Sequence, residues 1–563
     1  MIDHNTEPHP QLPHRPHLWP GSIYVIVAAS LIGMTAVRIA TTYRTFTGTY
    51  DEPFHIASGM EWLDKGTYSY ELQHPPLARV AMAVGPYLKG LRSHSLATAT
   101  DEGNAILQTH GTYQQNLLLA RLGNLPFLLL ACVVILLWAR RWFTAAGGLW
   151  ALLLFLSLPS ILGHAALATL DMACAATLLA ALYHLMRWLE TPLWWRSVSL
   201  GTALSLAFLT KFSNIAYVAV CCAAATAYWV VATRDRRQVY RQLKLRLRPA
   251  CITAGVLLVL LWAGYRFSLA PISTSVGVHK SIDQRFVAHS WMRRAAYKAL
   301  ETPIPLTPFV QGVSEVYTHN KSGHDSYLFG KYRMNGWWYF FPVVLGLKTP
   351  LGFLLLAVVG ILSALWRYRV TPWQHCLTAL FPIALLLLCM TSRIDLGIRH
   401  ILAIYPLLAL MAGNAICDVF LTRRWRMLSA LSLLVVCMVV AESWLAHPDY
   451  LAYFNQLAGG HPETFLAESD LDWGQDLHRL SLRLKVLGIK HIAIRYFGTA
   501  PLGSVDLPDY RLLCPDEKTT GYVAISVRFT TLEYAKSGAY GWLKRYKPLE
   551  RIGKSIFLYC IEQ

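Results

Sequence analysis

The sequence predicts an α-helical polytopic membrane protein that ends in a small α/β domain outside the membrane. Of its 563 residues, 55% are hydrophobic and only 15% are charged, with a mean hydropathy of +0.37. A soluble protein of this length normally carries about a quarter charged residues. Uncharged apolar runs of bilayer-spanning length recur up to about residue 446, and beyond this point the pattern becomes that of a soluble fold.

About eleven apolar runs are long enough to be membrane spans. We expect them near residues 21–42, 115–139, 146–163, 166–187, 198–211, 213–233, 250–268, 337–366, 374–392, 399–421 and 427–446. Residues 1–20 are rich in Pro and His and lack the pattern of a signal peptide, which predicts a disordered cytoplasmic leader and a retained first span.

The net charge of +19 reflects the clustering of basic residues between spans. These clusters are Arg140-Arg141, "RDRRQVYRQLKLRLR" from Arg234, "RYR" from Arg367 and "RRWR" from Arg423. With a cytoplasmic N-terminus, every cluster falls on the cytoplasmic side, as the positive-inside rule requires. The charge therefore predicts orientation in a bacterial inner membrane and no nucleic-acid partner, since no basic soluble domain stands out.

This topology divides the chain into a leader (1–20), a transmembrane catalytic domain (21–446) and a periplasmic α/β domain (447–563). The external loop at about 43–113 should hold two short helices, "FHIASGMEWL" and "LARVAMAVGPYL", and a second long loop covers about 269–336. In the last domain we expect a helix, "LHRLSLRLKVLG", and the strands "HIAIRYF", "GYVAISVRF" and "SIFLYCI". Cys514 and Cys560 form either a disulfide or two free thiols.

Ionisable side chains gather at the external face of the predicted membrane domain, where each calls for an explanation. They are Asp51, Glu52, His74, Asp171, Lys211, Lys348, Asp395, Arg399 and His400. This convergence of carboxylates with cations on one face predicts a site.

Each of these residues also has a structural interpretation. Asp51-Glu52-Pro53 is a good start for a helix, with an Asp cap and acid in the first turn. Lysines at membrane depth can extend to the interface, and Arg399 can anchor to lipid headgroups or bind phosphate. Asp171 is harder to explain structurally, because burying it without a partner costs several kcal/mol.

In order along the chain, the "DE" pair, "HPPL", "TLDM" and "LTK" resemble the GT-C membrane glycosyltransferases, specifically the protein O-mannosyltransferase and aminoarabinose transferase group. The later "LKTPLG", "SRIDLGIRHILAIYP", "YLAYFNQLAGG" and "ESDLDWGQDL" resemble a bacterial mannosyltransferase-like branch of that group. The resemblance covers most of the chain. It implies the GT-C fold and inverting transfer of a sugar from a polyprenyl-phosphate carrier.

The resemblance also assigns residues. It implies that Asp51 is the catalytic base and that Asp171 is a second carboxylate of the site, with Glu52 as a less certain neighbour. The MIR domains of the protein mannosyltransferases have no counterpart in this sequence, which leaves the acceptor open between a protein, a glycolipid and a glycan.

The residue chemistry fits this reaction independently. A hydroxyl nucleophile benefits from a carboxylate base, and a leaving polyprenyl phosphate needs cations. The candidates for binding the phosphate or the sugar are His74, Arg79, Lys211, Lys348, Arg399 and His400. A divalent metal held by Asp51, Glu52 or Asp171 is the less favoured alternative, because the resemblance implies a metal-independent reaction and the basic residues make a metal less necessary.

Two other functions remain as alternatives to a glycosyltransferase. A transporter or flippase of lipid-linked sugars would place polar residues through the whole bilayer and would show inverted repeats with broken helices. A non-catalytic scaffold would bind a partner through the external domain, for example through Asp470, Asp472 and Asp476. These aspartates lack the Gly and terminal Glu of an EF-hand loop, so a helix-capping turn or a contact with the membrane domain is favoured.

Overall fold

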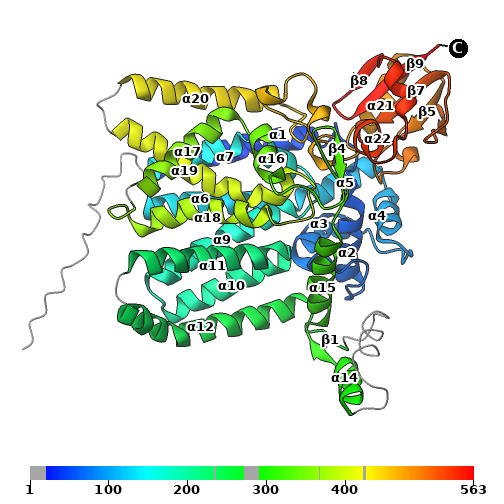
Figure 1. Ribbon diagram of the computed structural model, residues 1–563. Coiled ribbons are helices and arrows are strands. Elements are labelled where there is room, and N and C mark those ends of the chain that lie inside the picture. The colour runs from blue at the N-terminus through cyan, green and yellow to red at the C-terminus, as the bar shows by residue number, and fades with distance from the viewer. Residues whose placement is uncertain (1–20, 234–235, 272–290, 367, 422–425, 563) are drawn as a thin grey trace, which may run out of the picture.

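A computed structural model describes residues 21–233, 236–271, 291–366, 368–421 and 426–562. The predicted leader lies outside this range, as do parts of three of the basic clusters. Long, roughly parallel helices form a bundle, and shorter helices, hairpins and the C-terminal sheet lie at one end of it, which we call the bundle end (Figure 1).

The long helices coincide with the predicted spans. They are α1 (Gly21–Thr42), α5 (Tyr113–Leu122), α6 (Leu125–Trp142), α7 (Ala145–Leu156), α8 (Pro159–Ala165), α9 (Asp171–Glu190), α10 (Trp194–Thr210), α11 (Ser213–Ala232), α12 (Arg236–Gly264), α16 (Phe340–Lys348), α17 (Leu351–Trp366), α18 (Trp373–Cys389), α19 (Tyr405–Leu421) and α20 (Arg426–Leu445). Within the described ranges, 7 helices are long and apolar enough to cross a membrane, or up to 9 if each bent pair is one span, against the eleven or so expected. Helices α10 and α18 lie at the other two expected spans but have only 17 residues each. The chain is thus a multi-pass membrane protein.

Two expected spans are broken rather than straight. Helices α7 and α8 meet at 69°, and α16 and α17 meet at 119°. A polar contact ties the two breaks together, because the Ser160 hydroxyl donates to the Lys348 carbonyl oxygen over 3.1 Å. Breaks of this kind are tolerated at membrane depth where neighbouring groups satisfy the freed backbone.

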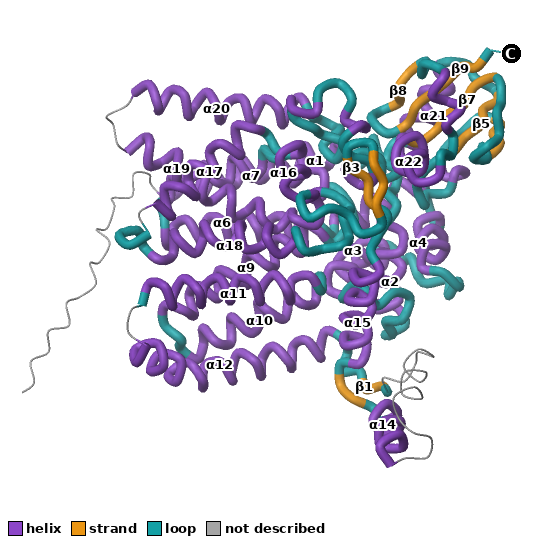
Figure 2. The backbone as a smooth tube through the Cα atoms, viewed as in Figure 1, coloured by secondary structure: helices purple, strands orange, loops and turns teal. Residues whose placement is uncertain are grey.

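The first external loop folds as expected into α2 (Glu52–Asp64) and α3 (Pro76–Leu88), and it adds α4 (Ala99–Gln108). The second contains α14 (Trp291–Glu301) and α15 (Thr307–Ser322), with the hairpins β1 (Leu269–Ala270)/β2 (Ile304–Pro305) and β3 (Ser326–Leu328)/β4 (Lys331–Arg333). A short 3₁₀ helix, Ile398–Ile404, precedes α19. All of these except α14 and the β1/β2 hairpin pack close to the C-terminal sheet or the bundle end (Figure 2).

The C-terminal region forms a five-stranded sheet in the order β6-β5-β7-β9-β8. Its elements are α21 (Leu477–Val486), β5 (His491–Arg495), β6 (Asp509–Leu512), β7 (Gly521–Ser526), α22 (Tyr534–Ser537), β8 (Glu550–Ile552) and β9 (Ile556–Ile561). Strand β5 pairs in parallel with both β6 and β7, and β9 pairs antiparallel with β7 and β8. Helix α21 and strands β5, β7 and β9 were predicted; the short helix α22 and the edge strands β6 and β8 were not.

Cys514 and Cys560 are free thiols. Cys514 follows β6, Cys560 lies in β9, and two strands separate these elements in the sheet. Three strand spacings of about 4.8 Å exceed the roughly 7 Å that a disulfide can bridge between Cα atoms. Of the two open alternatives, the pair of free thiols is the one that this sheet accommodates.

Candidate functional site

A cavity of about 800 Å³ lies where the bundle end, the external loops and the C-terminal domain meet. One part of its wall is apolar and comes from α11, α15 and α18: Ile215, Ala216, Ala219, Val313, Val316 and Leu388. The ionisable part consists of Asp51, Glu71, His74, Lys211, Arg399, Glu468 and Arg528. The cavity therefore combines a lining suited to a hydrocarbon chain with a cluster of ionisable groups.

Asp51 lines this cavity at the N-cap position of α2. Its side chain makes no capping hydrogen bond, so the helix start does not occupy the carboxylate. Instead, Arg399 Nη1 donates to Asp51 Oδ2 over 2.5 Å, and both side chains stay partly exposed, at 13% for Arg399 and 16% for Asp51. A carboxylate held in this way is oriented yet still reachable from the cavity.

Glu52 points elsewhere and does not line the cavity. Arg121 Nε and Nη2 donate to its two oxygens over 2.8 Å each, and the side chains are 0% and 1% exposed. The Ala168 amide and the Thr49 amide and hydroxyl also donate to it. Burial alone would raise the pKa of Glu52, but Arg121 and these hydrogen bonds hold the pKa below its usual value.

Asp171 begins α9 and is 3% exposed. Lys211 Nζ donates to Asp171 Oδ1 over 2.7 Å, and His164 Nδ1 lies 3.8 Å from Oδ2. Lys211 lines the cavity, whereas Asp171 lies behind it. The buried carboxylate thus has the partner that its apolar surroundings require, and it orients the lysine that faces the cavity.

His74 lines the cavity, and Arg79 supports it from behind. His74 Nδ1 lies 3.0 Å from Glu71 Oε2, and burial lowers the pKa of His74 to about 4. Arg79 is fully buried and donates to Glu71, to the Tyr68 hydroxyl over 2.9 Å and to His55 Nδ1 over 3.2 Å. Arg79 therefore fixes the loop that carries His74 and does not reach the cavity.

Lys348 also stays outside the cavity. Its Nζ donates to the carbonyl oxygens of Leu451 over 2.8 Å and Asp470 over 2.5 Å, and the residue is 1% exposed. These bonds attach the break between α16 and α17 to the start of the C-terminal region.

Arg399 and His400 both line the cavity, from the 3₁₀ helix before α19. Arg399 lies over the Trp473 ring at 4.5 Å, a cation–π contact that fixes the guanidinium opposite Asp51. Gly397, just before, has φ +119°, and a Cβ there would lie 2.5 Å from Asp470 Oδ2. Asp470 Oδ1 in turn accepts from the Ile398 amide over 3.0 Å, so this close approach sets the position of Arg399.

Several lining residues had no place in the predicted site. They are Tyr50, His319, Asn320, His324, Glu468, Trp473, Phe497 and Arg528. For the acidic "ESDLDWGQD" stretch the sequence favours a helix-capping turn or a contact with the membrane domain, and this contact is present in the bonds of Asp470 to Lys348 and Ile398. Its neighbours Glu468 and Trp473 line the cavity, which no sequence pattern indicated.

No metal ligand set is evident within the described part of the chain, where no group of three or more His, Cys, Asp or Glu side chains is arranged to hold an ion. Asp51 and Asp171 each face a cationic side chain instead of each other. Lys211, Arg399 and Arg528 place cationic side chains in this cavity, each paired with a carboxylate. That the protein needs no metal, with a divalent ion as the less favoured alternative, stays a prediction.

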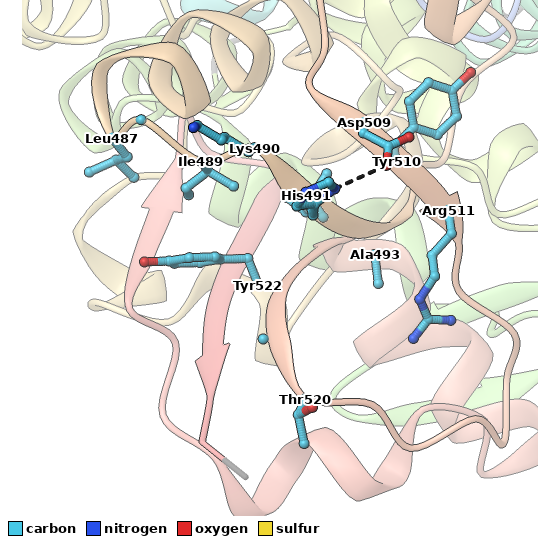
Figure 3. A pocket seen from close by; sticks show the side chains of 13 residues that line it. Leu487, Ile489, Lys490, His491, Ala493, Asp509, Tyr510, Arg511, Thr520 and Tyr522 are labelled. Atoms are coloured by element: carbon cyan, nitrogen blue, oxygen red, sulfur yellow. Dashed lines mark hydrogen bonds and ion pairs between the residues drawn. The ribbon is translucent and has the colours of Figure 1, made fainter.

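A second hollow, of about 650 Å³, lies on the C-terminal sheet and is lined by Lys490, His491, Asp509, Tyr510 and Arg511 among others (Figure 3). His491 and Asp509 lie 3.0 Å apart but are 80% and 79% exposed. These residues sit at the amino ends of β5 and β6, whereas ligands of parallel sheets bind at the carboxyl ends. We therefore place the functional site in the larger cavity.

No protein-family model matches this chain, and no curated protein matches it in sequence. The structure resembles ArnT from Cupriavidus metallidurans bound to undecaprenyl phosphate, with a TM-score of 0.51 and 17% identity over 96% of this chain and 98% of that one. Weaker likenesses include the S. cerevisiae protein O-mannosyltransferase Pmt1-Pmt2 complex bound to the sugar donor, with a TM-score of 0.47, 12% identity and coverage of 75% and 88%. The Archaeoglobus fulgidus oligosaccharyltransferase AglB, in complex with an inhibitory peptide and a dolichol-phosphate, has a TM-score of 0.47 and 12% identity over 94% and 74%.

The likeness to ArnT covers nearly the whole of both chains, including the bundle and the C-terminal sheet. The fold expected from the sequence motifs is thereby confirmed: the protein has the GT-C fold, in the form found in ArnT.

Proposed function

We propose that the protein is an inverting glycosyltransferase that moves a sugar from a polyprenyl-phosphate carrier to an acceptor hydroxyl at the periplasmic face of the inner membrane. The observation that supports this best is that one cavity has an apolar wall formed by α11, α15 and α18 and is also lined by Lys211 and by the Asp51–Arg399 pair. The ArnT structure that shares the fold holds undecaprenyl phosphate, which supports a lipid of this class.

The proposed donor fits the two kinds of wall. Its polyprenyl chain would pack on the apolar side chains, and its phosphate would lie near Lys211 and Arg399. Cationic side chains stabilise the charge that grows on a leaving phosphate. Lys211 is held by Asp171 and Arg399 by Asp51, so both cations are positioned before the donor arrives.

In the reaction, an acceptor hydroxyl oxygen attacks the anomeric carbon from the side opposite the phosphate. A carbon–oxygen bond to the acceptor forms while the bond to the phosphate oxygen breaks, and the electron pair leaves with the polyprenyl phosphate. Asp51 takes the hydroxyl proton. The donor phosphate competes with Asp51 for Arg399, which frees the carboxylate to act as the base once the donor is bound.

The test uses purified full-length protein in proteoliposomes with polyprenyl phosphates that carry radiolabelled mannose, glucose or 4-amino-4-deoxyarabinose, and a bacterial membrane extract as the acceptor source. Label from one donor should enter a product. The Asp51→Asn variant should remain folded and lose about 10²- to 10⁴-fold in initial rate, the usual contribution of a general base.

Three outcomes contradict the proposal. They are the absence of turnover with every donor, full turnover by Asp51→Asn, and movement of the labelled lipid between leaflets without sugar transfer. The last outcome would favour the flippase alternative.

A further inference from the structure

The C-terminal domain forms part of the wall of the cavity. Glu468, Trp473, Phe497 and Arg528 all line it. The same domain holds the backbone of the residue directly before the proposed base: the Tyr50 amide donates to the Trp473 carbonyl over 2.9 Å, and the Thr499 hydroxyl donates to the Tyr50 carbonyl over 2.8 Å. Its position relative to Asp51 is therefore fixed by direct bonds.

The end of the sheet that faces the cavity is the end at which parallel sheets bind ligands. Phe497 follows the carboxyl end of β5, and Arg528 follows the carboxyl end of β7. In open α/β sheets, ligands lie outside the carboxyl ends of the parallel strands. The domain thus presents the carboxyl ends of its parallel strands, where ligands bind, to Asp51, while the hollow of Figure 3 lies at the amino ends.

Four side chains at this end of the sheet pack together and include an ion pair; this group consists of Arg528, Glu468, Phe497 and Tyr50. Arg528 Nε donates to Glu468 Oε1 over 2.5 Å, and the Arg528 guanidinium lies 4.3 Å from the centre of the Phe497 ring. Phe497 also stacks on Tyr50, with ring centres 5.1 Å apart and planes at 17°. Tyr50 is 41% exposed and is the residue directly before Asp51.

We propose that this group binds the acceptor and that the acceptor is a neutral saccharide. This inference rests on the proposed function: the lipid donor fills the apolar side of the cavity, so the acceptor enters from the side of the C-terminal domain. The Tyr50 ring, backed by Phe497, offers a flat apolar surface for the C–H face of a sugar ring. Glu468 accepts hydrogen bonds from sugar hydroxyls, and Arg528 donates to their oxygens.

Charge favours a neutral acceptor over a polyanionic one. Arg528 and Glu468 are 15% and 12% exposed and neutralise each other. A phosphorylated acceptor would need cations beyond those that the donor phosphate occupies. A paired carboxylate and guanidinium instead provide both hydrogen-bond acceptors and donors at nearly zero net charge, which suits hydroxyl groups.

The test compares two reactions of the full-length enzyme in proteoliposomes, using the radiolabelled polyprenyl-phosphate mannose, glucose and aminoarabinose donors. One is release of free sugar to water without acceptor, and the other is transfer to a neutral glycan fraction of the membrane extract. In the Glu468→Gln/Arg528→Met variant, the ratio of transfer to hydrolysis should fall by about ten- to a hundredfold, the effect expected for lost hydrogen bonds to charged groups. The KM for the glycan should rise by a similar factor.

A matched control exists in the same domain. Arg551 pairs with Glu463 over 2.9 Å and lies 5.2 Å from the Phe557 ring centre, but none of these three residues lines the cavity. The Glu463→Gln/Arg551→Met variant should leave the ratio unchanged. Tyr50→Ala, which leaves both ion pairs intact, should lower the ratio as the first variant does.

Any one of three results would contradict the proposed acceptor site. These results are an unchanged ratio in both test variants, an equal fall in the control, and label that enters a proteinase-sensitive or phosphorylated product. If wild-type protein neither hydrolyses nor transfers any donor, the proposed function itself fails, and that result is distinct from the loss of the acceptor site alone.

Discussion

Asp51 and Glu52 are neighbours in the sequence, yet their carboxylates lie in opposite environments. Glu52 is fully buried and receives hydrogen bonds from Arg121, Thr49 and Ala168. Asp51 lines the cavity, and Arg399 donates to one of its oxygens. A carboxylate whose lone pairs all accept hydrogen bonds, such as Glu52, cannot accept a proton from a substrate. Asp51 can accept one in the proposed mechanism, once Arg399 binds the donor phosphate.

The two lysines of the predicted site differ in the same way. Lys348 is buried, and backbone carbonyls accept its hydrogen bonds, while Lys211 is paired with Asp171 and faces the cavity. Ionisable groups on one membrane face therefore divide into those that hold the fold and those that face a ligand. The predictions below test this division.

The largest expected effect is the loss of stability when the buried pair is broken. In Glu52→Gln, the fully buried Arg121 loses its counter-charge, and removing one partner of such a pair costs about 3–5 kcal/mol. We expect a large fall in the thermal unfolding midpoint, measured by tryptophan fluorescence in nanodiscs. Asp51→Asn, one residue away and partly exposed, is the matched control and should shift the midpoint far less. Equal shifts for the two variants would contradict the division.

The next largest effect concerns catalysis through Arg399. Arg399→Met removes the cation proposed to stabilise the leaving phosphate, and loss of one such preorganised donor typically lowers kcat by about 10²- to 10³-fold. Arg399→Lys keeps the charge and should recover part of that rate. The measurement is initial transfer rate at saturating donor. A variant without the cation that turns over at the wild-type rate would remove Arg399 from the mechanism.

Much of this arrangement could be predicted from the sequence, because local patterns of apolar and basic residues indicate membrane topology. The positions of apolar runs and basic clusters were enough to gather Asp51, Asp171, Lys211 and Arg399 on one face. The structure forms the pairs Asp51–Arg399 and Asp171–Lys211 from exactly these four residues.

Which carboxylate pairs with which cation could not be predicted from the sequence. Arg121 lies within an expected span and 69 positions from Glu52, so nothing local marks it as the partner of one carboxylate rather than the other. Glu468 precedes α21 and Arg528 follows β7, so these two residues, 60 positions apart, meet only through the tertiary fold of the C-terminal domain. The edge strands β6 and β8 were missed because they have 4 and 3 residues and little apolar alternation.

A smaller effect is expected from Lys348→Met. The substitution leaves the buried carbonyls of Leu451 and Asp470 without this donor, at a cost of about 1–3 kcal/mol for an unsatisfied group. The unfolding midpoint should fall, while the KM for the donor should change little, because Lys348 does not line the cavity. A raised donor KM with an unchanged midpoint would return Lys348 to the phosphate site.

The smallest effect is a pH dependence of stability from His74, because its side chain is 28% exposed and solvent screens the effect. Burial lowers the pKa of His74 to about 4 in the folded protein, against about 6.5 in an unfolded chain. Between these values the unfolded chain binds more protons, so stability is complete above pH 6.5 and falls toward pH 4 by at most about 1.4 kcal/mol per pH unit. His74→Gln removes this contribution and should give a shallower slope of unfolding midpoint against pH. Burial also lowers the pKa of His324 to about 4, so wild type and variant must be compared over the same range. His461→Gln, at an exposed histidine, is the control for loss of a surface histidine. Identical slopes for wild type and His74→Gln would show that His74 is not held neutral at the cavity wall.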